Sequence, residues 1–216
     1  MHLKRNKVPK SWPITRKGST FVVRPSGSLK EGVPVLVFLR DMLKVAQNRK
    51  EVKKALYEKK VFLNQRPIAD EKQVVLFYDI ITIVPAKKNF RLEISTRGKF
   101  EAREIKEDDA RKKIAKVIDK KVLKGKKVQI NLNDGNNFIS DIKCKVNDSV
   151  IINLDKKHIE KSVPLEEKRS AVIFAGKHAG KEGIIEKIIA EKKSTEIKTG
   201  DGEKVSVLIK QMMAVK

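Results

Sequence analysis

The residues that come closest to a catalytic motif lie at 175–182 and read AGKHAGKE. Ala175, Gly180 and Lys181 match a phosphate-loop pattern of Ala or Gly, four residues, Gly, Lys and then Ser or Thr, and the match fails at Glu182. In a phosphate loop this spacing lets backbone N–H groups surround the phosphates while the lysine reaches the terminal ones. The segment is therefore either a variant nucleotide-binding loop or a tight turn built from glycine and lysine.

The residues that follow this segment argue against nucleotide hydrolysis. A phosphate loop leads into a helix, because the helix N-terminus supplies phosphate-facing N–H groups. Gly183 and the β-branched pair after it predict a strand instead. Glu182 also replaces the hydroxyl that would bind Mg²⁺ and would place a negative charge beside the phosphates. We expect a tight turn between strands, and the polar side chains projecting from it are Lys177, His178 and Lys181.

No other group of residues has the spacing of an active site. The three histidines, His2, His158 and His178, lie in different segments, and none has another histidine or a cysteine four residues away. No Gly-x-Ser-x-Gly elbow accompanies them. The single cysteine, Cys144, excludes an internal disulfide and a cysteine-cluster metal site, and we expect it to be a small buried side chain. The sequence predicts no enzyme activity, no cofactor, no metal and no small-molecule substrate.

The chain carries a large excess of positive charge. Among 216 residues there are 50 Lys and Arg against 27 Asp and Glu, a formal net charge of +23. Like charges repel one another in a compact fold, so a polyanion that neutralises the excess is expected, and nucleic acid is the commonest. The alternative is a highly soluble basic domain without such a partner. The net charge is +13 over residues 1–90, +6 over 91–168 and +4 over 169–216, which predicts the densest contacts at the N-terminal end.

Residues 1–36 are expected to form a basic arm. Apart from a short TFVV run, residues 1–33 lack a helical or strand period, which by itself predicts disorder. Phe21, Val22 and Val23 indicate that part of the arm packs down. Two roles are open for Trp12, stacking on an unpaired base or packing into its own hydrophobic pocket. The segment 1–30 contains no acid and carries the cations Lys4, Arg5, Lys7, Lys10, Arg16, Lys17, Arg24 and Lys30.

Two helices are predicted after the arm. The first begins at Pro34 and places Leu36, Leu39, Leu43 and Ala46 on one face. The second begins at Asn48, which has Glu51 three residues later in a capping arrangement. Its apolar stripe contains Val52, Ala55 and Leu56. The opposite face is basic and contains Arg49, Lys50, Lys53 and Lys54, a pattern typical of either a solvated face or a surface that binds phosphates.

The rest of the chain is predicted to be largely β. Short strands are expected around KVFLNQRPI and over 73–84, and a hairpin over 89–105 turns at Arg97-Gly98. We expect a helix over 106–123, because its first turn is acidic and basic residues follow. Strands over 126–133, near 138–142 and over 149–154 form a β-rich middle region. Five strands within 169–216, with a tight turn at Thr199-Gly200-Asp201-Gly202, predict a small SH3-like barrel. The predicted class is multidomain α+β.

Six blocks of the sequence resemble, in the same order, the small-subunit ribosomal protein family S4e of archaea and eukaryotes. The blocks are HLKRNKVPKSWP, RPSGSLKEGVPVLVFLRDMLKVAQN, FYDIITI, NFRLEISTRGKFEAREI, KVNDSVIINL and FAGKHAGKEGII. The resemblance covers essentially the whole chain. The chain ends after the barrel-like segment, without the C-terminal extension of eukaryotic members, so we expect an archaeal-type member.

The resemblance implies three modules after the arm at 1–36. They are an S4-like RNA-binding domain at 37–87, a central domain particular to the family at 88–168 and a KOW motif in an SH3-like barrel at 169–216. The implied role is structural: binding the ribosomal RNA of the small subunit and supporting its folding and assembly. Neighbouring small-subunit proteins are implied partners, and the implied location is the cytoplasm. The apolar runs are too short for a membrane span, and the basic N-terminus lacks the hydrophobic region of a secretory signal.

The implied RNA-binding residues are those whose side chains can meet phosphates or bases. They are Lys4, Arg5, Lys7, Lys10, Trp12, Arg16, Lys17, Arg24, Arg49, Lys50, Lys53, Lys54, Lys60, Arg66, Lys177, His178 and Lys181. The KOW turn is implied to use Gly176, Gly180 and Gly183. One departure concerns Tyr78, since the S4-type pattern commonly has glycine before the residue equivalent to Asp79. An RNA-associated factor or enzyme built from S4-type and KOW modules is the alternative, although the sequence has no catalytic motif to support it.

Overall fold

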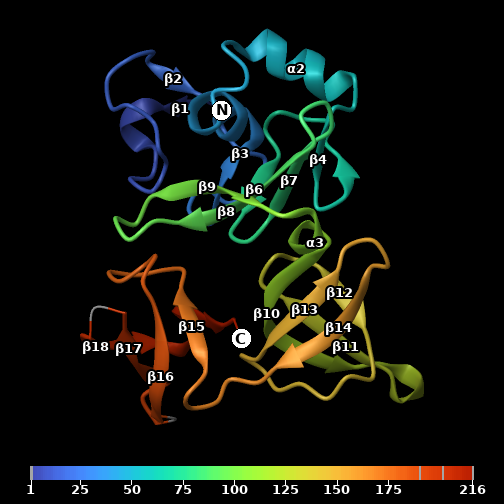
Figure 1. The fold of residues 1–216 in the computed structure, drawn as a ribbon, viewed down its shortest axis with the longest axis vertical. Coiled ribbons are helices and arrows are strands. Elements are labelled where there is room, and N and C mark those ends of the chain that lie inside the picture. Colours follow the sequence, from blue (N-terminus) through green and yellow to red (C-terminus); the bar gives the residue numbers. More distant parts are fainter. Residues whose placement is uncertain (1, 190, 201, 216) are drawn as a thin grey trace. The chain divides into compact units, whose positions relative to one another are not determined.

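The computed structural model describes residues 2–189, 191–200 and 202–215 and divides into two compact units (Figure 1). Unit 1 contains Met1–Ser95 and Lys99–Arg111, and unit 2 contains Thr96–Gly98 and Lys112–Lys216. Both units consist mostly of short antiparallel strands, so the expected largely β fold with few helices is confirmed. No helix in the described part of the chain has the length and apolar character needed to cross a membrane.

Unit 1 combines short helices with antiparallel strands. Its helical segments are η1 (Arg5–Lys7), α1 (Val35–Val37), η2 (Phe38–Met42), α2 (Arg49–Tyr57) and α3 (Glu107–Ala110). Its strands are β1 (Leu3–Lys4), β2 (Phe21–Val22), β3 (Gly32–Pro34), β4 (Val61–Leu63), β5 (Arg66–Pro67), β6 (Val74–Leu76), β7 (Ile80–Ile83), β8 (Lys88–Ile94) and β9 (Phe100–Ile105). β1 pairs with β2, β3 pairs with β6, and the other five form a sheet in the order β5-β4-β7-β8-β9.

The first helical segment begins where the sequence predicts but ends earlier. Leu36 and Leu39 are buried as expected. The helix continues through the π-helical η2 and ends before Lys44, whose φ of 55° is left-handed and cannot extend a right-handed helix. The predicted extension to Ala46 is therefore wrong.

The prediction for α2 is confirmed at its N-terminus and along its apolar stripe. The Asn48 side chain accepts a hydrogen bond from the Glu51 backbone N–H at 3.0 Å, and the Glu51 carboxylate accepts one from the Gln47 N–H at 2.7 Å. The first of these bonds satisfies an N–H group that the start of a helix leaves unpaired. Val52 and Leu56, on the apolar face of α2, are buried, so the cap and this face together hold α2 in place.

The N-terminal arm is ordered, which corrects the expectation that it is disordered when considered alone. Trp12 is only 2% exposed and belongs to the hydrophobic core of unit 1. Its indole N–H donates a hydrogen bond to the carbonyl of Leu29 at 3.2 Å. Leu3 is also buried, and its strand β1 pairs with β2 across the loop 5–20 (Figure 1). Of the two roles open for Trp12, the structure shows packing, so its ring is not available to stack on a base.

Tyr78 occupies the turn between β6 and β7 without disrupting it. Its φ is 64°, a conformation that glycine adopts more readily. The carboxylate of buried Asp79 accepts hydrogen bonds from the Leu76 N–H and from the Asn64 side chain, both at 2.7 Å. The guanidinium of Arg91 lies 4.7 Å from the centre of the Tyr78 ring. The contact of the Tyr78 ring and the hydrogen bonds of Asp79 therefore hold this turn, although the chain has Tyr78 where the S4-type pattern commonly has glycine.

Unit 2 contains two five-stranded antiparallel sheets, each with its own core. The first sheet has the order β12-β11-β10-β13-β14 and consists of β10 (Lys112–Val122), β11 (Val128–Leu132), β12 (Asn137–Ile139), β13 (Ser149–Asn153) and β14 (His158–Val163). The second has the order β18-β17-β16-β15-β19 and consists of β15 (Ser170–Ile173), β16 (Glu182–Ile189), β17 (Ser194–Thr199), β18 (Lys204–Leu208) and β19 (Met212–Ala214). Two 3-10 turns, η3 (Lys124–Lys126) and η4 (Ile209–Gln211), complete the unit.

The helix predicted over 106–123 is wrong beyond its first turn. Only α3 is helical, and β10 forms a strand that pairs with β11 on one side and β13 on the other. The acidic start gave a correct helix signal for α3, but the β-branched residues Ile114, Val117 and Ile118 favour a strand. The five strands predicted within 169–216 are all present, and the turn after β17 includes Asp201, which lies outside the described residues.

Two lysines of β10 are buried in unit 2. Lys113 is 2% exposed, and its Nζ lies 2.6 Å from Oδ2 of Asp134 in the turn after β11. Burial by itself would raise the pKa of Asp134, but the Lys113 ammonium and hydrogen bonds from Asn136 outweigh it and hold that pKa below its ordinary value. Lys116 is 4% exposed and donates hydrogen bonds to the carbonyls of Ile209 and Met212, which lie in η4 and β19 at the second sheet. Lys116 therefore links the two sheets of unit 2.

Gly183 in β16 is required by close packing. A Cβ at this position would lie 2.3 Å from the Lys198 carbonyl oxygen and 2.7 Å from a methyl group of Ile197. We predict that Gly183→Ala lowers the free energy of unfolding of unit 2 by about 1–3 kcal/mol, because the backbone of β17 must move. Urea denaturation measures the change. Gly200→Ala is the matched control, since its Cβ meets no atom within 4 Å, and equal destabilisation by both variants would contradict this account.

Burial of Lys116 predicts a pH-dependent stability. Desolvation lowers the pKa of Lys116 from 10.5 to about 8. Between pH 8 and 10.5 the Lys116 side chain keeps its proton in the unfolded chain but loses it in the folded chain, so raising the pH favours folding. The difference in unfolding free energy between wild type and Lys116→Met should rise by up to about 3 kcal/mol from pH 7.5 to 10. Exposed Lys121→Met is the control, and a flat difference for Lys116→Met would contradict the lowered pKa.

Candidate nucleic-acid interface

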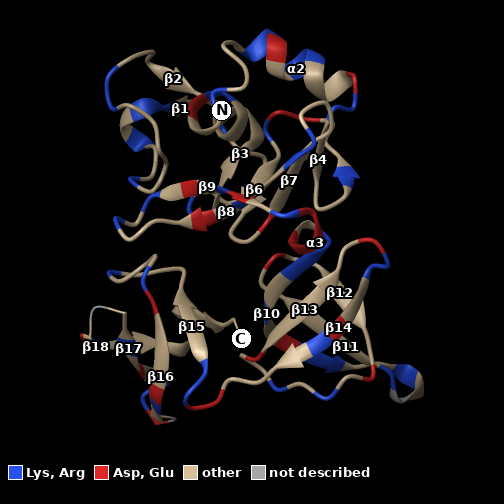
Figure 2. Ribbon diagram, viewed as in Figure 1, with Lys and Arg blue, Asp and Glu red and all other residues tan. Residues whose placement is uncertain are grey.

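The second helix, α2, presents a basic face to solvent. Arg49, Lys50, Lys53 and Lys54 are all exposed, whereas Val52 and Leu56 face the core. These four residues lie on one capped helix, and the helix holds their Cα atoms at fixed spacings. Figure 2 shows Lys and Arg along α2 and in the loops of the arm.

The cations of α2 differ in how far they are neutralised. Arg49 donates to the buried carboxylate of Glu71 at 2.5 Å, and Lys53 lies 3.9 Å from the same oxygen. Lys50 and Lys54 have no hydrogen-bond or ion-pair partner for their ammonium groups within the part of the chain that the structure describes. These two side chains are the members of the face best placed to take a phosphate, since binding one breaks no existing pair.

Lys60 and Arg66 lie next to α2 in sequence, at the hairpin formed by β4 and β5. Lys60 is exposed and pairs with Glu58, and this contact holds the pKa of Glu58 below its ordinary value. Arg66 lies opposite Leu63 in the hairpin register and is exposed. The structure thus places both residues at the surface of unit 1, as it does the basic face of α2.

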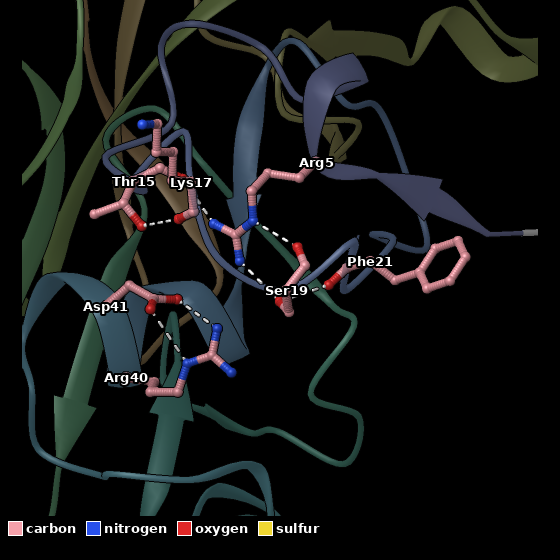
Figure 3. Close-up of polar contacts among 7 residues, drawn as sticks. All are labelled: Arg5, Thr15, Lys17, Ser19, Phe21, Arg40 and Asp41. Carbon is pink, nitrogen blue, oxygen red and sulfur yellow. Dashed lines mark hydrogen bonds and ion pairs between the residues drawn. The ribbon is translucent and has the colours of Figure 1, made fainter.

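Arg5 stabilises the loop of the arm between β1 and β2 by hydrogen bonds. Its guanidinium donates to the carbonyls of Thr15 and Ser19, each at 2.7 Å, and to the Ser19 hydroxyl at 2.9 Å (Figure 3). All three acceptors are neutral, so the hydrogen bonds order the loop without cancelling the charge. Arg5 therefore shapes the arm as well as contributing to its positive potential, a structural role that its place in the sequence did not indicate.

The other predicted cations of the arm lie at the surface. Lys4, Lys7, Lys10, Arg16, Lys17 and Arg24 are all exposed. Because β1, β2 and Trp12 tie the arm to the core, these charges occupy defined positions rather than moving with a free chain. Trp12 does not belong to this surface.

Two further cations line a cleft in unit 1 and were missed at the sequence level. Arg40 of η2 and Lys72 of the loop before β6 share this cleft with Arg5, Arg24 and Arg49. Arg40 carries a bidentate pair with Asp41, at 3.2 and 2.8 Å (Figure 3). Neither residue lies in a basic cluster of the sequence, so only the fold, which brings the arm beside α1 and η2, reveals them.

In unit 2, the segment AGKHAGKE connects β15 to β16 as a tight turn, and a strand follows it as the sequence predicted. Gly176 has a φ of 91°, and a Cβ there would lie 2.8 Å from the Gln211 side chain. The Gly180 N–H donates to the Ile173 carbonyl at 2.7 Å and closes the turn. The turn thus returns the chain to its own sheet instead of leading into a helix.

The basic side chains of this turn differ in exposure and pairing. Lys177 is exposed, and His178 is partly exposed. Lys181 lies 2.9 Å from the carboxylate of Glu203, and this contact holds the pKa of Glu203 below its ordinary value. Across residues 2–189, 191–200 and 202–215, no group of three or more His, Cys, Asp or Glu side chains has an arrangement that would hold a metal ion.

Comparison with known protein families identifies two matching regions. Residues 1–27 match the RS4NT domain, and residues 86–159 match the ribosomal family S4e. The first region contains most of the arm, and the second contains strands from both units.

Similar proteins match most of the chain. The small ribosomal subunit protein eS4 of Methanocella arvoryzae is 37% identical over 190 residues, which are 87% of this chain and 80% of that protein. The protein of the same name from Nanoarchaeum equitans is 35% identical over 192 residues, 87% of this chain and 82% of that one. The crystal structure of the 30S ribosomal protein S4e from Thermoplasma acidophilum matches with a TM-score of 0.73 and 25% identity, over 86% of this chain and 95% of that chain.

These similarities agree with the resemblance that the six sequence blocks carry. Proteins of this family are structural ribosomal proteins and not enzymes, so the near match of AGKHAGKE to a phosphate loop does not mark a nucleotide hydrolase. The chain belongs to the ribosomal protein family S4e, and the relatives described above are archaeal.

Proposed function

We propose that this chain binds the ribosomal RNA of the small subunit and supports its folding and assembly, and that the basic surface of unit 1 makes the principal contacts. The observation that carries the proposal is the basic face of α2, where Lys50 and Lys54 stand exposed and form no ion pair with a carboxylate among the described residues. Phosphate contacts of this kind supply most of the sequence-independent affinity for nucleic acid.

The proposal assigns a role to each predicted segment. Residues 1–36 act as a basic arm, 37–87 as an S4-like RNA-binding domain, 88–168 as the central domain and 169–216 as a KOW motif in an SH3-like barrel. The helical segments at 35–42 and 49–57, followed by a hairpin, support the S4-like assignment. The five-stranded antiparallel sheet and the turn from Gly176 to Gly183 support the KOW assignment.

The proposed RNA contacts are exposed or partly exposed Lys, Arg and His side chains of these segments. They are Lys4, Arg5, Lys7, Lys10, Arg16, Lys17, Arg24, Arg49, Lys50, Lys53, Lys54, Lys60, Arg66, Lys177, His178 and Lys181. The relatives' names place them in the small ribosomal subunit, and we propose the same location, in the cytoplasm, for this chain, with neighbouring proteins of the subunit as further partners.

We predict that neutralising the face of α2 reduces the salt dependence of RNA binding. Each phosphate contact contributes about 0.9 to the slope of log K against log salt concentration, so Lys50→Gln, Lys53→Gln and Lys54→Gln together should reduce the slope by about 3. The measurement is a titration of the wild-type and triple-variant chains with an archaeal small-subunit rRNA transcript at KCl concentrations from roughly 50 to 300 mM, a range over which such contacts weaken strongly.

A triple variant with the same loss of charge controls for net charge alone. Lys156, Lys157 and Lys161 are exposed at the hairpin of β13 and β14, and we propose no RNA contact for them. Their change to Gln should reduce the slope by less than the α2 variant does. Equal reductions would contradict the assignment of the α2 face, and affinity that does not vary with salt in the wild type would contradict RNA binding by phosphate neutralisation.

A further inference from the structure

An open cleft of about 620 Å³ in unit 1 is lined mainly by cations and apolar side chains, and none of the described residues that line it is acidic. It lies between the strands of the arm and the segment formed by α1, η2 and the start of α2. Its charged lining residues are Arg5, Arg24, Arg40, Arg49 and Lys72. A concavity lined by charges of one sign concentrates field lines and attracts an anion.

Three of these five charges are not cancelled by a carboxylate. Arg49 pairs with Glu71 and Arg40 with Asp41, but the partners of Arg5 are two carbonyls and a hydroxyl. Arg24 and Lys72 are exposed, and the described residues offer no hydrogen-bond or ion-pair partner to either side chain. The cleft therefore carries an uncompensated positive charge.

An aromatic pair stands at the same cleft. The Phe21 ring is 53% exposed, and the His2 ring lies against it with centroids 5.3 Å apart at a 49° tilt. Phe21 belongs to neither the core of unit 1 nor its packed surroundings, so its exposure has no packing explanation within the described chain. Figure 3 shows Phe21 on the strand that follows the loop fastened by Arg5. An exposed ring beside cations is the combination that binds an unstacked base and its phosphate.

We propose that this cleft binds one unpaired nucleotide of the RNA, with its phosphate at Arg24 and Lys72 and its base stacked on Phe21. The inference rests on the proposed function, since it names the RNA element that this surface takes. The volume lies within the range of about 300–1,000 Å³ typical of sites for small ligands. Arg5 supplies charge from the wall of the cleft and holds the loop that leads to Phe21.

The observations favour an unpaired nucleotide over the other anions that a basic cleft attracts. Paired RNA presents phosphates but keeps its bases stacked, so Phe21 would have no ligand. An acidic protein segment would satisfy Arg24 and Lys72 without needing an exposed aromatic ring. An unpaired nucleotide brings a phosphate and a free π-face together.

The test compares a short RNA duplex, the same duplex with a one-nucleotide bulge and the bulged duplex with an abasic bulge. Wild type should bind the bulged duplex at least about fivefold more tightly than the other two, the contribution of one base stack. Phe21→Leu should reduce this ratio to about one, and Phe21→Tyr, which keeps an aromatic ring, should retain it. Val122→Ala, which alters an exposed apolar side chain of unit 2, is the control and should also retain the ratio. Circular dichroism of each variant verifies folding.

The outcomes separate this inference from the proposed function. If wild type bound all three RNAs in a salt-dependent way but with equal affinity, the inference would be overturned and the proposed function would stand. A ratio that Phe21→Leu retains would also overturn it. No binding to any RNA would overturn both. If a polyglutamate peptide displaced the bulged RNA and bound wild type and Phe21→Leu equally, the cleft would belong to an acidic protein segment, and the inference would fail.

Discussion

The burial of Trp12 is the interaction on which the basic surface of unit 1 depends. The segment 1–30 carries many cations and no acid, and such a segment is expected to remain disordered unless apolar side chains anchor it. Trp12 enters the core and donates a hydrogen bond to Leu29, and Leu3 brings β1 against β2. Because the arm is fixed, its arginines meet Arg40 and Lys72 around one cleft. The cost of assembling like charges is offset when phosphates neutralise them.

Unit 2 contains two buried lysines that connect different parts of its sheets. Lys113 pairs with Asp134 inside the first sheet, and Lys116 donates to carbonyls at the second. A buried ammonium is costly unless its hydrogen bonds are made, so an arrangement that separated these groups would be disfavoured. We infer that these contacts favour one packing of the two small cores over alternatives, a role that the apolar contacts of Ile130 or Ile197 cannot perform alone.

Local signals in the sequence predicted some elements well and missed those that depend on tertiary contacts. The Asn48 cap, the Gly98 turn and the strand after AGKHAGKE follow from nearby residues, and all are present. The charge pattern of 106–123 predicted a helix where β10 forms. The segment is a strand because its pairing with β11 and β13 outweighs that local pattern. The cations of α2 could be predicted from their spacing. The cleft could not, since Arg40 and Lys72 join the arm only through the fold.

The central claim is that the N-terminal part of the chain makes the densest RNA contacts. Ultraviolet cross-linking of the chain within assembled small subunits, followed by mass spectrometry of the cross-linked peptides, tests it most directly. The account predicts that most cross-links fall in residues 2–88, with Phe21 and the peptides around α2 among them. Cross-links concentrated in residues 112–215, with few or none in the arm and α2, would contradict it.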